Sequence, residues 1–175
     1  MQNLVLLLRI GDRSLLYMIN HKLRCNVLDR FMELSTNLGG APFTVAVSLF
    51  LMLWGKGTLK NTAMLGAIAL TLSFIGGFFL KRIFERRRPY QEIPDTYTGA
   101  KLFKDYAFPS GHTTASFSLA VSYALAYPYL TFLLISCALL VGISRIYLGQ
   151  HYPSDVLVGG LLGSTAAVLT KLLMI

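Results

Sequence analysis

Four long stretches of this sequence contain no charged residue, and they constrain its fold more than any other feature. They run over residues 34–55, 61–80, 106–144 and 156–170. A helix needs about 20 mostly apolar residues to cross the hydrocarbon core of a bilayer. The third stretch is long enough for two helices joined by a turn at Tyr127-Pro128-Tyr129, and residues 172–175 extend the last stretch past Lys171. The sequence therefore predicts an integral membrane protein with five transmembrane helices.

The N-terminal region has a different pattern. Asp12 is expected to cap a helix with Leu15, Leu16 and Leu23 on one face, and a second apolar face follows over residues 27–38. Such patterns are typical of amphipathic helices at a membrane surface, although a sixth, tilted span remains open. We predict an all-α, single-domain membrane bundle of five to six transmembrane helices over residues 1–175, with interfacial helices in 1–38 and the transmembrane core in 39–175. Only 14% of the residues are charged, well below the roughly 25% of soluble domains, which supports this class.

Basic residues concentrate in the run KRIFERRR, residues 81–88. Such a run is usual where a membrane helix ends on the side that retains positive charge, or where anionic head groups bind. Lys81 and Arg88 are seven residues apart, so on a helix they share one face and can reach one anion. Pro89 then ends or kinks that helix. The chain offers little soluble surface, so we expect no nucleic-acid partner.

A second polar motif is FPSGHTTAS, residues 108–116, directly before a charge-free run. Ser110 is a good helix N-cap, which leaves the backbone N–H groups of Gly111 and His112 unpaired in the first turn. A helix start of this kind can bind an anion. Taken alone, the motif also fits an ordinary helix start with a structural histidine.

The third motif, SRIYLGQHYPSD, covers residues 144–155. Arg145 ends one apolar run, and Pro153 is well placed to begin the next helix. Asp155, four residues after His151, is expected to hydrogen-bond one imidazole nitrogen and leave the other free as a nucleophile or base. A plain loop whose aspartate caps a helix is the equally simple alternative.

Alternating helix directions would bring the three motifs to one side of the membrane, which favours a common role. Phosphoryl transfer suits such a cluster, because cations and backbone N–H groups stabilise the charge on the equatorial oxygens of its transition state. A zinc site built from His112, His151 and Asp155 is disfavoured, because neighbouring cations repel a metal ion and no HExxH-like spacing occurs. We expect neither a metal nor another cofactor.

Together the motifs match a known pattern. KxxxxxxRP over residues 81–89, PSGH over 109–112 and SRxxxxxHxxxD over 144–155 occur in order. The chain thereby resembles the type 2 phosphatidic acid phosphatase family, membrane lipid phosphatases related to vanadium haloperoxidases. No signature position departs from the pattern, although the first 60 residues resemble the family only in their helical layout.

The resemblance implies a role for each signature residue. The phosphate would be bound by Lys81, Arg88, Ser110, Gly111 and Arg145. His151 would attack phosphorus to form a phosphohistidine, Asp155 would orient it, and His112 would protonate the leaving oxygen, without a metal ion. Because one histidine must be neutral and the other protonated, and an ordinary histidine has a pKa near 6.5, we expect a bell-shaped pH profile.

The expected function is hydrolysis of a terminal phosphate from a membrane lipid. The preferred substrate is undecaprenyl diphosphate, followed by phosphatidylglycerol phosphate or phosphatidic acid, a preference that rests on the resemblance alone. A non-catalytic lipid-binding protein or a transporter is the alternative class, and it would need the cations but not an oriented histidine. A haloperoxidase is less expected, because those enzymes are soluble.

The side of the membrane that the site faces is predicted differently by two arguments. Apart from the signature residues, the site's side carries more basic residues (Arg82, Arg86, Arg87, Lys101 and Lys104) than the opposite side (Lys56, Lys60 and Lys171). That count favours a cytoplasmic site. The resemblance implies the opposite, because many family members that recycle the undecaprenyl carrier face outward, and we expect a multi-pass protein of the cell membrane with an extracytoplasmic site.

Overall fold

The computed structural model describes residues 2–99 and 102–174, and these residues form helices and turns with no β-strand among them. The helices are α1 (Gln2–Tyr17), α2 (Asn26–Thr36), α3 (Ala41–Trp54), α4 (Thr58–Phe84), the single turn α5 (Pro89–Glu92), α6 (Gly111–Ala126), α7 (Thr131–Tyr147) and α8 (Pro153–Met174). A short π-helix spans Met18–Lys22, and single 3-10 turns span Asn37–Gly39 and Pro128–Leu130. The predicted all-α class is confirmed, and the predicted turn at residues 127–129 joins α6 to α7.

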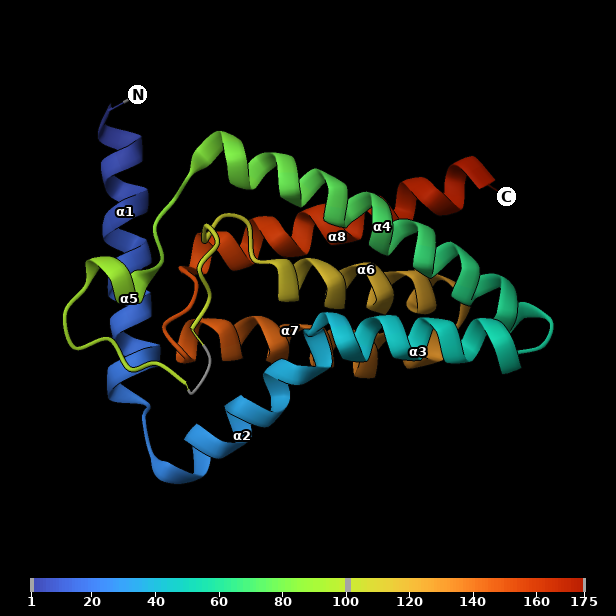
Figure 1. Ribbon diagram of the computed structural model, residues 1–175, viewed down its shortest axis with the longest axis horizontal. Helices are drawn as coiled ribbons and strands as arrows, with labels where there is room; N and C mark the ends of the chain where they lie inside the picture. Colours follow the sequence, from blue (N-terminus) through green and yellow to red (C-terminus); the bar gives the residue numbers. More distant parts are fainter. Residues whose placement is uncertain (1, 100–101, 175) are drawn as a thin grey trace.

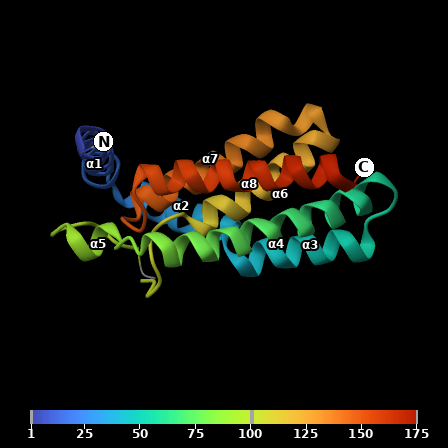
Figure 2. The same cartoon turned by 90° about the horizontal axis from the view of Figure 1, so that it is seen from above.

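Helices α3, α4, α6, α7 and α8 run roughly side by side and form an elongated bundle (Figure 1). Helix α6 lies in its middle and packs against α8, α7 and α4. Helix α1 crosses one end of the bundle at a steep angle, and Figure 2 shows it nearly along its own axis. The end that α1 crosses is where α4 and α7 finish and where α6 and α8 begin.

Two glycines let α8 approach α6 closely at this end. A methyl group on Gly159 would lie 2.7 Å from the carbonyl oxygen of Ser110, and one on Gly163 would overlap the backbone of Thr114. No larger residue fits at either place without moving a backbone, because real side chains do not approach that closely. The start of α6 is therefore held in direct backbone contact with the second and third turns of α8.

The outer surface of the bundle is apolar, as expected for a surface in contact with lipid. Exposed side chains include Phe74, Phe132 and Leu173. Among the described residues, the helical segments Thr58–Glu92, Pro128–Tyr147 and Pro153–Met174 are each long and apolar enough to cross a membrane, and the pair Asn26–Gly39 with Ala41–Trp54, bent by 48°, can supply a fourth span.

The predicted number of five to six spans is not reproduced by this measure. Helix α6 has 16 residues and therefore a length of about 24 Å, which is less than the roughly 30 Å of a bilayer core. Its buried face carries hydroxyl side chains such as Ser118 and Ser122. Because α6 is surrounded by other helices, it does not need the apolar surface of a lipid-facing span.

One prediction for the N-terminal region is wrong. Asp12 was expected to cap a helix that begins directly after it. No helix begins there, because α1 continues through Gly11 and Asp12 without a break. Apolar side chains of the region remain exposed, among them Leu15, Val27 and Leu34. The interfacial position of residues 1–38 and the single-domain boundary stay predictions, and Met1 and Ile175 lie outside the described residues.

Candidate active site

The signature residues gather at the end of the bundle that α1 crosses. Lys81 lies in the last turn of α4, Ser110 directly precedes α6, Arg145 lies in the last turn of α7, and Asp155 lies in the first turn of α8. The predicted convergence of the three motifs is therefore seen in the structure. How each side chain is held differs in several places from the prediction.

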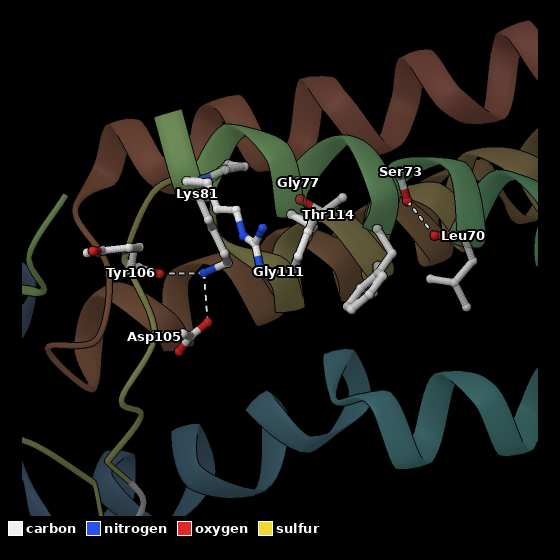
Figure 3. A pocket seen from close by; sticks show the side chains of 13 residues that line it. Leu70, Ser73, Gly77, Lys81, Asp105, Tyr106, Gly111 and Thr114 are labelled. Carbon is white, nitrogen blue, oxygen red and sulfur yellow. Dashed lines mark hydrogen bonds and ion pairs between the residues drawn. The ribbon is translucent and has the colours of Figure 1, made fainter. Parts of the chain in front are cut away.

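Lys81 and Arg88 converge on one carboxylate, although not by sharing a helical face. Helix α4 ends at Phe84, because Glu85 adopts a left-handed conformation with φ of 43°, and residues 85–88 have no regular secondary structure. Lys81 Nζ lies 2.9 Å from Asp105 Oδ2, and Arg88 Nη2 lies 2.7 Å from Asp105 Oδ1. Figure 3 shows Lys81 reaching Asp105 and the carbonyl oxygen of Tyr106.

Arg88 is 2% exposed and well supplied with partners. Its Nε donates to the carbonyl oxygen of Asp105 at 2.9 Å, and its Nη1 donates to that of Gln150 at 3.0 Å. The same Nη1 lies 3.2 Å from His151 Nε2. A buried guanidinium needs several such bonds to offset its loss of hydration.

The geometry around His151 fixes its tautomer. His151 Nδ1 lies 2.7 Å from the carbonyl oxygen of Ala107, which can only accept, so Nδ1 carries the proton. In the neutral ring, Nε2 then carries no proton, and its lone pair accepts a hydrogen bond from Arg88 Nη1 at 3.2 Å. Burial lowers the pKa of His151 well below its usual value, and the charges of Arg88, Arg145 and Lys81 lower it further. The ring is therefore neutral around pH 7 and has the form that a nucleophile needs.

The predicted hydrogen bond from His151 to Asp155 is not formed. Asp155 Oδ2 lies 3.7 Å from His151 Nδ1, beyond hydrogen-bonding distance. That oxygen instead accepts the backbone N–H of Tyr152 at 2.8 Å, and Oδ1 accepts from Arg86 at 2.7 Å. The carbonyl of Ala107 takes the orienting place next to the ring, and the buried Asp155 carboxylate lies behind it.

Arg86 connects this carboxylate to the N-terminal helix. It donates to Asp155 through Nη1 and to Asp12 through Nη2, at 2.7 and 2.6 Å. Asp12 also accepts the backbone N–H of Ser154 at 2.9 Å, in the first turn of α8. Asp12 was expected to cap the helix directly after it. It instead satisfies a backbone N–H in the first turn of α8, 142 positions later in the chain.

Arg145 is 1% exposed and has fewer partners. Its Nη1 donates to Thr36 Oγ1 at 2.8 Å, and its Nε has no hydrogen-bond partner. The ring of Phe103 lies between the two buried arginines, with its centroid 5.1 Å from the Cζ atoms of both Arg88 and Arg145. The His112 ring meets Phe103 edge-on at 5.8 Å.

The start of α6 supplies backbone donors, as predicted. Ser110 occupies the N-cap position, but its hydroxyl makes no cap bond and instead accepts from Thr113 Oγ1 at 2.9 Å. Apart from its chain neighbours and the backbone of α6 itself, no described atom lies within 4 Å of where a Cβ on Gly111 would stand. Gly111 is therefore open on its side-chain side, and it lines one of the cavities beside the cluster.

Two cavities adjoin the cluster. One, of about 350 Å³, runs along α4 and α6 from Leu70 to Lys81 and is lined mostly by apolar side chains, with Gly111 and Asp105 at its polar end (Figure 3). The other, of about 840 Å³, is lined by Arg145, His112 and Phe103 together with residues of α2 and α3. The loop over residues 102–107 borders both cavities.

Five residues near the cluster were not found from the sequence: Thr36, Arg86, Phe103, Asp105 and Ala107. Phe103 belongs to the polar connection over residues 90–104, of which residues 90–99 and 102–104 are described, whereas Lys101 lies outside the described residues. Ala107 acts through its carbonyl, which no side-chain pattern reveals. Within residues 2–99 and 102–174, no three His, Cys, Asp or Glu side chains are grouped as metal ligands.

Several curated proteins similar to this chain are phosphatases by name. It is 32% identical over 161 residues to the lipid A 1-phosphatase of Rhizobium etli, covering 80% of this chain and 68% of that protein. It is 36% identical over 116 residues to the undecaprenyl-diphosphatase of Sulfolobus acidocaldarius, covering 63% and 56%. The chain thus spans between 56% and 68% of the length of these relatives.

Solved structures show the same fold. Aquifex aeolicus LpxE superposes with a TM-score of 0.80 at 28% identity, covering 90% of this chain and 93% of that one. The transmembrane PAP2-type phosphatidylglycerolphosphate phosphatase of Bacillus subtilis gives 0.75 at 25%, covering 95% and 85%. A profile of the PAP2 superfamily matches residues 61–174, a range that contains every predicted site residue. The chain therefore belongs to the PAP2 superfamily of membrane lipid phosphatases.

Proposed function

We propose that this protein removes a terminal phosphate from a membrane lipid through a phosphohistidine at His151, without a metal ion. The observation that carries the proposal is the Nε2 lone pair of His151, which faces Arg88 within a buried group of cations. Lys81, one of these cations, lies at the polar end of an apolar cavity, and Arg145 lines a second cavity together with His112. A lipid tail fits such a cavity, while its phosphate reaches the cations.

In the first step, His151 Nε2 attacks phosphorus, a P–N bond forms, and the P–O bond to the lipid breaks. His112 gives its proton to the leaving oxygen. The phosphate oxygens are held by the side chains of Lys81, Arg88 and Arg145, and by Ser110 and the Gly111 amide. Groups of this kind stabilise the charge of the transition state more than that of the substrate.

In the second step, water attacks the phosphohistidine, its proton passes to His112, and the P–N bond breaks to release inorganic phosphate. The Ala107 carbonyl holds the Nδ1 proton throughout, supported by the negative charge of Asp155 behind it. The cations already supply the charge that a metal ion would provide, which is why we propose a metal-independent reaction.

For the substrate, we propose undecaprenyl diphosphate, in line with the similarity to an undecaprenyl-diphosphatase. The similarity to a lipid A 1-phosphatase over a larger share of the chain makes a lipid A 1-phosphate a second candidate. Phosphatidylglycerol phosphate and phosphatidic acid complete the set. All four present a phosphate at the membrane surface on an apolar anchor.

The test is phosphate release from each of the four lipids by the detergent-purified protein with EDTA present, beside His151→Ala and a control, His21→Ala. His21 lies in the N-terminal region and stacks on Tyr17, away from the cluster. We expect one lipid to be hydrolysed by the native protein and the control, and none by His151→Ala. The native protein trapped with labelled substrate should carry phosphate on a histidine.

Two results would contradict the proposal. Loss of activity in EDTA that added metal restores would exclude the metal-independent reaction. Equal lipid binding by the native protein and His151→Ala, with no phosphate released by either, would favour the lipid-binding or transport alternative.

We further propose a multi-pass protein of the cell membrane, acting as a single unit over residues 1–175, with its site on the extracytoplasmic side. Labelling with an impermeant thiol reagent in intact cells tests the side, after Cys25 and Cys137, both exposed, are changed to serine. We expect labelling of Lys104→Cys, near the site, and none of Lys56→Cys, between α3 and α4 at the other end. The reverse pattern would place the site in the cytoplasm.

A further inference from the structure

The cationic cluster already holds an anion supplied by the protein itself. Both oxygens of Asp105 are in use, one by Lys81 at 2.9 Å and the other by Arg88 at 2.7 Å. Each oxygen of the carboxylate thus binds one cation. Two oxygens of a phosphate would bind the same two cations in the same way. The ring of Phe103, from the same loop, fills the space between Arg88 and Arg145.

We propose that Asp105 is a specificity-determining residue, whose carboxylate occupies the place of two substrate phosphate oxygens between Lys81 and Arg88 and is displaced when substrate binds. This inference rests on the proposed function, since it takes the cluster to be the phosphate site. It adds a competitor that every ligand of the site must displace.

The contacts of Asp105 allow this displacement. Its side chain is 53% exposed, so water can solvate the carboxylate as it leaves, and the oxygens of the incoming ligand replace it at Arg88, which is 2% exposed. The backbone that follows Asp105 is held by bonds that do not involve the Asp105 carboxylate. The Ala107 N–H donates to the Arg86 carbonyl at 2.8 Å, and the Ala107 carbonyl accepts from His151. The carboxylate can therefore leave by rotating about its own side-chain bonds, without disturbing the tautomer of His151.

The charge of Asp105 sets which ligands succeed. Partial burial alone would raise the pKa of Asp105, but the hydrogen bond from Lys81 and the charges of Arg88 and Lys81 outweigh it and lower that pKa, so the group is ionised at neutral pH. A phosphate monoester or terminal diphosphate carries about two negative charges at pH 7, whereas a phosphodiester carries one. The surrounding phospholipids are phosphodiesters in large excess, and Asp105 keeps them from occupying the cluster.

The test uses Asp105→Asn, which keeps the shape and removes the charge. We expect inhibition by phosphatidylglycerol in mixed micelles to strengthen about tenfold, and the Kd of inorganic phosphate, measured by calorimetry on the detergent-purified protein, to fall by a similar factor. Asp95→Asn is the matched control, since Asp95 is an exposed residue of the same connection whose left-handed backbone (φ of 60°) an asparagine also tolerates.

Weaker phosphate binding in Asp105→Asn would overturn the proposal, because it would make Asp105 a residue that positions Lys81 and Arg88. Unchanged inhibition by phosphatidylglycerol would overturn it as well. Phosphate binding is measured without turnover, so the result for Asp105 is independent of lipid hydrolysis. Failure of the proposed function would instead appear as absent phosphate release from all four lipids while this binding difference persists.

Discussion

Arg86 and Arg88 are two residues apart, and each holds an aspartate at 2.7 Å. The partner of Arg86 is Asp155, which is fully buried, whereas the partner of Arg88 is Asp105, which is 53% exposed. Arg86 also binds Asp12 and Ser154, which lie outside the phosphate site. The two ion pairs have the same length but lie on opposite sides of His151, one behind the ring and one in front of it.

The comparison indicates that the burial of the aspartate, rather than the length of the ion pair, decides what each pair does. Asp155 is fully buried, so opening its pair with the partly exposed Arg86 would leave a carboxylate charge unpaired in a medium of low dielectric constant, and Arg86–Asp155 fixes the structure. Asp105 is reached by water, so its carboxylate can leave the buried Arg88 when the oxygens of a ligand take its place. Each of the following experiments changes one side of this comparison.

The largest effect is expected from Arg88→Met. The substitution removes the guanidinium that faces His151 Nε2 and that we assign to the phosphate. We expect kcat/KM for the lipid substrate to fall by about 10²–10³-fold, the range found when one donor to a developing oxyanion is lost. Arg87→Met, in the same basic run but exposed, is the control. A loss below about tenfold would argue against Arg88 as a phosphate ligand.

Arg86→Met should act mainly on stability. It leaves the buried Asp155 carboxylate with only the Tyr152 N–H as its partner, and breaking a buried pair costs about 3–5 kcal/mol. We expect a clear drop in Tm in detergent and a smaller loss of kcat than in Arg88→Met. An unchanged Tm beside Arg87→Met would show that Arg86–Asp155 does not fix the structure.

The pH profile tests the charges that surround His151. The ring must be neutral to attack, so activity is lost as pH falls through its pKa. Burial and the nearby cations lower that pKa, so the acid limb of kcat/KM should lie well below 6.5, the value assumed from the sequence. In Arg145→Met one of these cations is gone, and the limb should move to higher pH. A native limb at 6.5 or above would contradict this account.

The smallest effect is expected from Asp12→Asn. Arg86 then keeps Asp155 but loses the charge of its second partner, while the asparagine oxygen still accepts the Ser154 N–H. Because Arg86 is partly exposed, we expect a loss of only about 1 kcal/mol in unfolding free energy and a change in kcat below about twofold. A loss as large as that of Arg86→Met would mean that Asp12, rather than Asp155, is its principal partner.

The sequence was sufficient for the helical class, the family and the gathering of the signature residues at one end of the bundle. These follow from charge-free stretches and motif spacing, which depend on neighbours in the chain. It was not sufficient for the conformation of residues 85–88. A continued helix was expected to place Lys81 and Arg88 on one face, but a left-handed Glu85 ends α4 first, and the two residues meet through Asp105.

Contacts between distant segments were also missed, because patterns of neighbouring residues do not reveal them. The partners of His151 and Asp155 include a backbone carbonyl 44 residues away and an arginine 69 residues away. The i, i+4 spacing predicted a bond between His151 and Asp155. In the structure, His151 instead bonds to the carbonyl oxygen of Ala107, and Asp155 pairs with Arg86. The spacing indicated that the two residues are neighbours, and tertiary contacts decided which bonds they form.

The direct backbone contact at Gly159 and Gly163 has a mechanical consequence. It joins the start of α6, which contains the Ser110 and Gly111 donors of our proposal, to the second and third turns of α8, the helix that follows His151. If His151 is the nucleophile and Gly111 binds phosphate, as we propose, the two are held by one rigid pair of helices, and only loop residues such as Asp105 need to shift during a catalytic cycle. Because no helix has to slide against another, we expect turnover to vary little between bilayers of different thickness.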